Sequence, residues 1–174
     1  MLKSDFETER TSVTSWKSAL ADETLRNELV DDCKRILTPK VLRHLPDSLN
    51  VSARSEDINQ WIDARDAEST VLTIKEKTTS KMLGFMILAE LPQHDPLQTV
   101  HLGYFFAEES WGKGYATEVL SGLIAHLTPQ ETPVQLMGGV EKSNLASAKV
   151  LLNAGFVIDP EKSDKITDMF VYEF

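Results

Sequence analysis

Two glycines in the run WGKGYAT, residues 111–117, are the feature of this sequence that most directly suggests chemistry. The run follows an apolar, strand-like segment, Val100 to Phe106, and leads into a helix-like segment, Thr117 to Leu127. Glycines allow a tight turn that directs consecutive amides toward one point, and a helix start adds unpaired N–H groups and a positive dipole end. The arrangement predicts a site for a phosphate-bearing ligand. The alternative is that the glycines serve only the geometry of the turn.

The elements that must position this turn follow from the spacing of the apolar residues. Residues 1–12 are expected to form an initial strand or a leader, and residues 15–66 have a mostly helical pattern. Alternating and β-branched residues predict strands at 70–75, 83–91, 100–106, 134–140, 156–158 and 167–174, the first two forming a hairpin and a loop following at 92–96. Helices are predicted at 117–127 and from Ser143 or Asn144 to Leu152, with Gly155 closing the second. This order predicts a mixed α/β sheet with helices packed on it.

Length and composition favour an ordinary globular protein. The 174 residues, 41% hydrophobic and 26% charged, predict one domain spanning 1–174. No apolar stretch approaches the roughly 20 residues that span a bilayer, and the first twelve residues lack the apolar core of a signal peptide. Cys33 stands alone, which excludes an internal disulfide and a cysteine-based metal site. We therefore expect a cytoplasmic protein without a membrane partner and without a metal.

The net charge of −9 bears on the kind of partner. Phosphate contacts in nucleic-acid complexes need clustered lysines and arginines, so the charge argues against nucleic acid. An acidic protein attracts a cationic substrate through its long-range field. The charge is equally compatible with a role in solubility alone.

Three blocks in the second half identify a resemblance. They are LGYFF at 102–106 followed by WGKGYATE at 111–118, then NLAS at 144–147, and then LLNAGF at 151–156. In order and separation they resemble the motifs of the Gcn5-related N-acetyltransferase (GNAT) superfamily, in the branch of RimJ/RimL-type ribosomal-protein N-acetyltransferases. The opening FETER at 6–10 is similar to the usual start of that branch. The resemblance implies a GNAT fold, in which a mixed central sheet contains a splayed parallel strand pair and carries helices on both faces.

The resemblance also implies acetyl-coenzyme A (acetyl-CoA) as co-substrate. Its pantetheine arm is expected between the parting strands 100–106 and 134–140, near the backbone of Phe105 and Phe106. Asn144 is implied to hydrogen-bond the pantetheine arm or the adenosine-side arm, with helix capping as an alternative or additional role. The pyrophosphate is implied to bind Trp111, Gly112, Lys113, Gly114, Tyr115, Ala116 and Thr117. The superfamily usually has Gln or Arg where this chain has Trp111, whereas Trp is common there in the RimJ/RimL-type branch.

Acetyl transfer requires a neutral amine, and therefore a base or a water chain that removes a proton. His101 is the candidate base, because strand alternation puts it on one face with Gly103 and Phe105 and its ordinary pKa suits neutral pH. Many relatives carry Glu there. A surface or packed histidine is the alternative, and the other candidate bases are Glu90, Glu108 and Glu109.

Two further positions concern the leaving sulfur. Ser147 matches a family serine one helical turn after the Asn, from where a hydroxyl reaches the sulfur. Many members carry a tyrosine acid seven residues after that Asn, but this chain has Leu151. Cys33 could in principle form a covalent acyl-enzyme, but its apolar neighbours favour a buried structural residue.

The sequence thus predicts an N-acetyltransferase that moves an acetyl group from acetyl-CoA directly to a primary amine. The expected acceptor is a protein N-terminus of the ribosomal-protein kind. A polyamine, an amine-bearing antibiotic, and a non-catalytic acyl-CoA-binding role are the alternatives. Homodimers are common in the branch, and nothing in this sequence fixes the oligomeric state.

Overall fold

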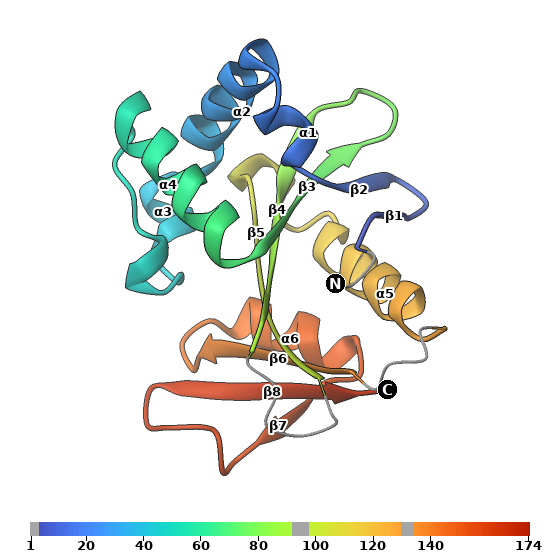
Figure 1. The fold of residues 1–174 in the computed structure, drawn as a ribbon. Coiled ribbons are helices and arrows are strands. Elements are labelled where there is room, and N and C mark those ends of the chain that lie inside the picture. The colour runs from blue at the N-terminus through green and yellow to red at the C-terminus, as the bar shows by residue number, and fades with distance from the viewer. Residues whose placement is uncertain (1–3, 92–97, 130–133) are drawn as a thin grey trace.

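A computed structural model describes residues 4–91, 98–129 and 134–174 of the chain (Figure 1). The predicted loop at 92–96 lies outside these residues. Their strands form one eight-stranded sheet with the order β1-β2-β3-β4-β5-β6-β8-β7. The strand bounds are Phe6–Glu7 (β1), Thr11–Ser15 (β2), Thr70–Glu76 (β3), Met82–Glu90 (β4), Gln98–Phe106 (β5), Val134–Glu141 (β6), Val157–Asp159 (β7) and Thr167–Glu173 (β8). Neighbouring strands are antiparallel except for β5 and β6, which run parallel.

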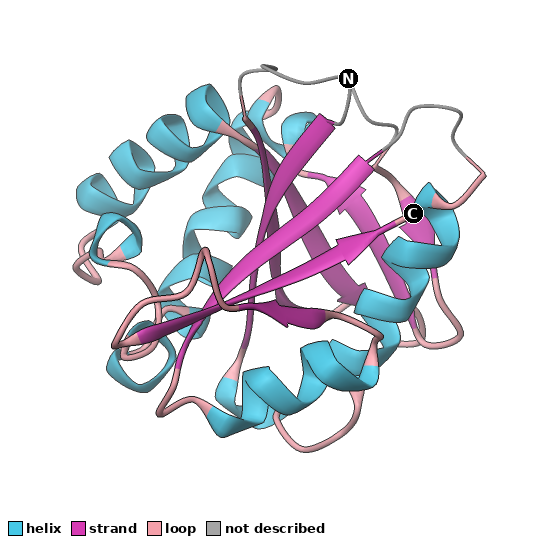
Figure 2. Ribbon diagram, turned by 90° about the horizontal axis from the view of Figure 1, so that it is seen from below, coloured by secondary structure: helices cyan, strands magenta, loops and turns pink. Residues whose placement is uncertain are grey.

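Helices cover both faces of this sheet (Figures 1 and 2). One face carries the helices of the first half, which are Lys17–Leu20 (α1), Glu23–Ile36 (α2), Pro39–Leu42 (α3) and Ser55–Glu68 (α4), with the 3-10 turn Asp47–Leu49 (η1). The other face carries Tyr115–Leu127 (α5) and Leu145–Asn153 (α6). A second 3-10 turn, Glu108–Ser110 (η2), links β5 to the turn before α5. Within the described ranges no helix is long and apolar enough to cross a membrane.

Each face has its own apolar core. The α1–α4 side is centred on Trp16, Trp61, Phe85 and Phe105, whose rings meet at centroid distances between 5.5 and 6.4 Å. Such aromatic pairs stabilise by about 0.5–1.5 kcal/mol beyond the area that they bury. On the opposite side α5 contributes residues one helical turn apart, including Val119 and Leu123, to a core shared with α6. Strand β5 lies between both cores, so its side chains alternate between them.

Most predicted elements are confirmed. The structure contains the hairpin of β3 and β4, the parallel strand before α5, and the two final strands. The expected initial strand consists of two short strands, β1 and β2. Cys33 is fully buried, and burial raises the pKa of its thiol to about 12, as expected of a structural residue.

The prediction that the second-half helix begins at Thr117 was wrong by two residues. The helix begins at Tyr115 because Gly114 precedes it in a left-handed conformation, with φ of 80°. The last three residues of the glycine run, Tyr115 to Thr117, therefore already belong to the helix. The final helix behaves as expected, since Asn144 caps it and Gly155, with φ of 93°, closes it.

Candidate functional site: a gap between two parallel strands

Strands β5 and β6 part midway along their length. They pair from Gln98 and Val134 as far as His101 and Met137, and then β5 continues to Phe106 and β6 to Glu141 without pairing. Gly138 marks the fork, because a Cβ there would lie 3.3 Å from the carbonyl oxygen of Leu102. The absence of a side chain lets the two backbones stay close up to the point where they separate. The predicted splayed strand pair is thus present.

The pairing of β5 with β4 determines which backbone groups face the gap. Leu91 N–H donates to Thr99 O at 3.0 Å, and Ala107 N–H donates to Leu83 O at 2.8 Å, so alternate residues of β5 bond to β4. The residues between them turn their backbone groups toward β6, and beyond the fork these are Tyr104 and Phe106. Phe105 instead directs its backbone to β4 and its ring into the α1–α4 core. The geometry therefore favours Tyr104 and Phe106 over Phe105 as backbone contacts for a ligand in the gap.

The glycine turn lies directly beyond β5. The indole Nε1–H of Trp111 donates to Phe106 O at 2.8 Å, which ties the start of the turn to the end of the strand. Gly112 has φ of 68°, and a Cβ built there would meet nothing within 4 Å. The backbone is open beside Gly112, and the unpaired N–H groups of the first turn of α5 follow it. The turn thus has the form that binds a phosphate.

The N-terminal segment supports this turn, a role that the sequence reasoning did not recognise. The Arg10 guanidinium donates to Lys113 O at 3.0 Å, lies 4.3 Å from the centre of the Tyr115 ring, and binds Glu118 at 2.6 Å. The Tyr115 hydroxyl donates to Glu76 Oε1 at 2.7 Å. The Tyr115 side chain therefore makes its contacts within the protein, whereas Gly112 and Lys113 are exposed to solvent. Ala116 and Thr117 are half-buried in the first turn of α5.

Helix α6 begins beside the gap and brings Asn144 and Ser147 together. The Asn144 side chain accepts from Ser147 N–H at 3.2 Å and donates from Nδ2 to Ser147 Oγ at 3.1 Å. The capping role of Asn144 is thus present. Because Ser147 Oγ accepts this hydrogen bond, its own O–H is left to point elsewhere. Leu151, where many relatives carry tyrosine, is buried in the core.

His101 stands at the fork itself, as the last β5 residue paired with β6. Its side chain lies on the same face as Phe105, toward α1–α4, while Leu102 and Tyr104 face α5 and α6. Partial burial lowers the pKa of the imidazole from its ordinary value. The ring is therefore neutral at pH 7, which is the form that accepts a proton. Its catalytic role stays a prediction.

The other carboxylates considered as bases are placed differently. Glu108 accepts from Thr38 Oγ1 at 2.6 Å and pairs with Lys40 at 3.2 Å. Glu109 pairs with Arg35 at 2.6 Å. These contacts tie η2 to the first-half helices and favour a structural role. Glu90 is exposed at the end of β4.

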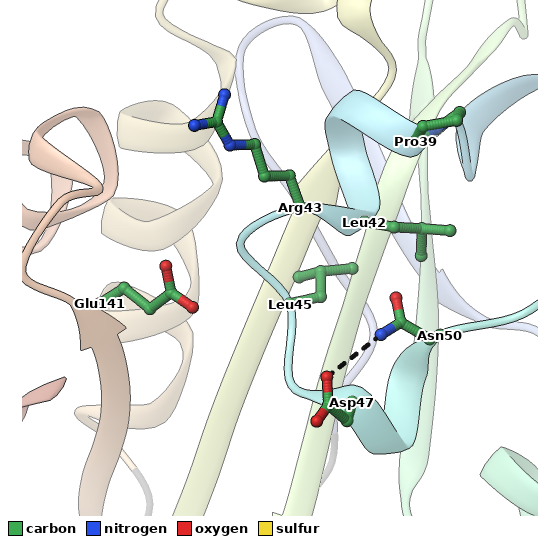
Figure 3. Close-up of a pocket in the computed structure, with 7 residues that line it drawn as sticks. All are labelled: Pro39, Leu42, Arg43, Leu45, Asp47, Asn50 and Glu141. Atoms are coloured by element: carbon green, nitrogen blue, oxygen red, sulfur yellow. Dashed lines mark hydrogen bonds between the residues drawn. The ribbon is translucent and has the colours of Figure 1, made fainter. Parts of the chain in front are cut away.

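A shallow pocket lies on the face that His101 shares with the first-half helices (Figure 3). Its volume is about 400 Å³, and its lining combines α3 and η1 with Glu141, the last residue of β6. Glu141 accepts from His44 Nδ1 at 3.3 Å, and Asp47 adds a second carboxylate. Arg43 is the cation of the lining, and Figure 3 shows its side chain extending from the end of α3 to a place above Glu141 in that view. No sequence motif marks Glu141 or His44, and only the fold brings them together.

The described residues contain no group of three or more His, Cys, Asp or Glu side chains placed to hold a metal ion. The site consists instead of backbone amides, hydroxyls and one imidazole around a gap in the sheet. The glycine turn and α6 lie at the ends of β5 and β6, and the pocket that contains Glu141 lies on the side of the first-half helices.

Comparison with known proteins agrees with this geometry. Residues 23–157 match the family described as the acetyltransferase (GNAT) domain, and the chain belongs to that family. A comparison with curated protein sequences found none that matches. Among solved structures, a GNAT-family acetyltransferase from Bacillus anthracis superposes with a TM-score of 0.69 at 14% identity, covering 98% of this chain and 97% of the other.

Two further structures concern ribosomal proteins. RimL, a ribosomal L7/L12 alpha-N-protein acetyltransferase in complex with coenzyme A (CoA), has a TM-score of 0.71 at 13% identity, with 98% of each chain covered. An acetyltransferase from Salmonella typhimurium that modifies the N-terminal serine of L7/L12 has a TM-score of 0.72 at 14% identity, with 96% of each chain covered. At these identities the likeness shows the fold. The chain is therefore an acetyltransferase-family protein with a RimJ/RimL-like fold.

Proposed function

We propose that the protein is an acetyl-CoA-dependent N-acetyltransferase that acetylates a primary amine directly, and that this amine is a protein N-terminus of the ribosomal-protein kind. One observation carries the proposal, namely the gap that opens beyond His101 and Met137 and ends at the glycine turn. The gap offers the backbone groups of Tyr104 and the N–H of Phe106, which an amide-bearing pantetheine arm can take up, while the Phe106 carbonyl is bonded to Trp111. The turn offers amides for the pyrophosphate.

The acceptor side is proposed to be the pocket of α3, η1 and Glu141. A protein N-terminus is positively charged before reaction, and the carboxylates of Glu141 and Asp47 favour its approach. The pocket shares the face of His101, so an amine bound there approaches the fork from the side opposite to α5 and α6. Donor and acceptor thus meet through the gap from opposite faces of the sheet.

The proton balance favours an N-terminal amine over a lysine or a polyamine. An α-ammonium group has a pKa of about 7.7–8.0, whereas an alkylammonium such as lysine has one of about 10.4. Each pKa unit corresponds to about 1.4 kcal/mol of proton-transfer free energy. Any base therefore faces a cost about 3.5 kcal/mol smaller with an α-amine, and the saving matters most for a base whose own pKa is lowered by burial, as that of His101 is.

The proposed reaction is a direct transfer. The ammonium group loses its first proton to His101, and the neutral nitrogen then attacks the thioester carbonyl carbon. The nitrogen loses its second proton to solvent as the amide forms. The new carbon–nitrogen bond forms as the carbon–sulfur bond breaks, and the bonding pair leaves with the CoA sulfur. Ser147 stands on the α6 side of the gap, where its free O–H can donate to that sulfur.

An assay of free thiol release tests the proposal. The purified chain is incubated with acetyl-CoA and with each of three acceptors: a peptide with the free N-terminus of a ribosomal protein, the same peptide with a blocked N-terminus, and spermidine. We expect thiol release with the free peptide alone, and mass spectrometry should place one acetyl group on its α-amine. Turnover only with spermidine would overturn the acceptor assignment, and binding without turnover would indicate a non-catalytic module.

A small-molecule acceptor is the second candidate. The microcin C7 self-immunity acetyltransferase MccE, solved with acetyl-CoA and AMP, has a TM-score of 0.66 to this chain at 17% identity. The open, polar pocket of about 400 Å³ has room for a compact amine. Inclusion of amine-bearing antibiotics in the same assay separates the two candidates.

A further inference from the structure

Tyr104 carries a buried hydroxyl that the fold leaves without a hydrogen bond. It is one of two side chains in the described residues with a buried polar atom that lacks a partner, the other being Arg65. The hydroxyl faces Ser147, yet no hydrogen bond of ordinary geometry joins them. Leaving a buried hydroxyl unpaired destabilises a protein, so its presence calls for a role outside the fold itself.

The position of Tyr104 suggests that role. It lies on β5, three residues beyond the last pair with β6, and its side chain is on the face covered by α5 and α6. Its ring packs edge-on against Phe106 at 6.4 Å, which restricts the direction of the hydroxyl. Ser147 and the capping residue Asn144 are fixed beside it. Two hydroxyls therefore converge at the edge of the gap, one from the strand and one from the helix.

We propose that the Tyr104 hydroxyl donates a hydrogen bond to the sulfur of CoA and, with Ser147, stabilises the thiolate as it leaves. This inference rests on the proposed function. It gives Tyr104 the task that many relatives assign to a tyrosine at the position of Leu151, here a buried core residue. The aromatic hydroxyl reaches the sulfur from the strand instead of the helix.

The step leaves all protons accounted for. The carbon–nitrogen bond forms and the carbon–sulfur bond breaks with its electron pair on sulfur. The ammonium group gives its first proton to His101 and its second to solvent as the amide forms. Tyr104 keeps its proton, because burial raises its pKa to about 12 against an opposing effect of the Ser147 hydroxyl. It is a hydrogen-bond donor at every working pH, and the thiolate gains its proton from solvent after release.

The test compares CoA with desulfo-CoA, which lacks the sulfur. Calorimetry measures both dissociation constants at pH 6.5 and pH 9 for the wild type, Tyr104→Phe and Ser147→Ala. A hydrogen bond to the thiolate lowers the pKa of the bound thiol below that of free CoA, so CoA should gain affinity relative to desulfo-CoA as the pH rises. We expect a gain of about tenfold in the wild type, as charge-assisted hydrogen bonds give, and less than threefold in Tyr104→Phe.

Tyr172→Phe is the matched control, because Tyr172 lies in β8 and its ring packs on Phe156 and Phe174, so this change should leave the gain unchanged. Thermal unfolding of the ligand-free protein adds a second readout. Removal of an unpaired hydroxyl should leave the melting temperature of Tyr104→Phe equal to or above that of the wild type.

Each contrary outcome has a distinct meaning. An equal pH-dependent gain in wild type and Tyr104→Phe, or no gain in the wild type, would overturn the role of Tyr104 while leaving CoA binding intact. Loss of binding of both ligands by Tyr104→Phe alone, or a lower melting temperature, would show that the hydroxyl is structural. Failure of the wild type to bind either ligand would overturn the proposed function as well.

Discussion

Arg10 binds Glu118 with both its backbone N–H, at 2.8 Å, and its guanidinium, at 2.6 Å. The two residues are 108 positions apart in the chain. Thr8 adds a third hydrogen bond, at 2.5 Å, so one carboxylate in the first turn of α5 holds the whole N-terminal segment. The same guanidinium bonds to Lys113 O in the glycine turn. The start of the chain thus fixes the shape of the proposed pyrophosphate site.

Loss of the Glu118 carboxylate should weaken both the fold and the site. Burial alone would raise the pKa of Glu118, but the hydrogen bonds from Thr8 and Arg10 hold it below its ordinary value. We expect Glu118→Gln to lower the free energy of unfolding by about 1 kcal/mol and to weaken CoA binding several-fold. Urea denaturation and calorimetry measure the two effects.

The same change should depend on pH. Because the folded-state pKa of Glu118 lies below the unfolded one, its contribution is complete above the unfolded value and is lost as the pH falls through the folded value. The difference between wild type and Glu118→Gln should therefore be largest near pH 7 and shrink below about pH 4. Glu7→Gln is the control: its pair with Lys77 is exposed and should change stability by less than about 0.5 kcal/mol.

Gly114→Ala should disturb the start of α5. Its φ of 80° is the left-handed region, where a side chain costs about 1–2 kcal/mol, and the new Cβ would lie 3.5 Å from the Arg10 guanidinium. We expect Gly114→Ala to lose about 1–2 kcal/mol of stability and to bind CoA at least fivefold more weakly. In Gly103→Ala the nearest atom to the Cβ is at 4.0 Å and φ is ordinary, so stability should hold. Equal destabilisation of the two variants would contradict the strain at Gly114.

His101→Gln tests the proposed base through its pH profile. Burial lowers the imidazole pKa, so wild-type kcat/KM should be level above about pH 6.5 and fall as the pH drops through the folded-state value. We expect the variant to lose about 100-fold or more in kcat/KM and to lose this acidic limb. His126→Gln, a change in the last turn of α5, should keep both the wild-type kcat/KM and the acidic limb. If His101→Gln retains the acidic limb of the pH profile, the group that titrates there is not His101.

Glu141→Gln tests the acceptor pocket. Removal of the negative charge should raise KM for the peptide amine several-fold while the dissociation constant of CoA stays the same, since we propose that the donor binds on the other face. The effect should diminish at high salt. Glu161→Gln, an exposed carboxylate in the β7–β8 connection, removes the same charge and should change neither constant. A change in CoA affinity would place Glu141 on the donor side.

The elements on the donor side could be predicted from the sequence because their signals are local. Alternation of apolar residues marks β3 to β5, the Asn144 cap and Gly155 delimit α6, and the two glycines mark the turn before α5. The start of α5 lies two residues before its predicted position, because the left-handed backbone of Gly114 lets the helix begin at Tyr115.

The contacts that complete the site were not predictable in the same way. Arg10 reaches Glu118 only through the order of the strands, and His44 reaches Glu141 only because the segment after α3 lies beside the end of β6. The direction of the Phe105 backbone likewise depends on its pairing with Phe85 in β4. These relationships join residues far apart in the chain, and no spacing rule connects them.

Because β5 parts from β6, the backbone amides of β5 can report whether the gap between the two strands is filled. Beyond the fork, the amides of Gly103 and Phe105 are bound by β4, whereas those of Tyr104 and Phe106 have no strand opposite them. Amide hydrogen exchange should therefore alternate residue by residue, slow at the first pair and fast at the second. A molecule that fills the gap would slow Tyr104 and Phe106 alone, so one short stretch of backbone distinguishes the filled from the open state.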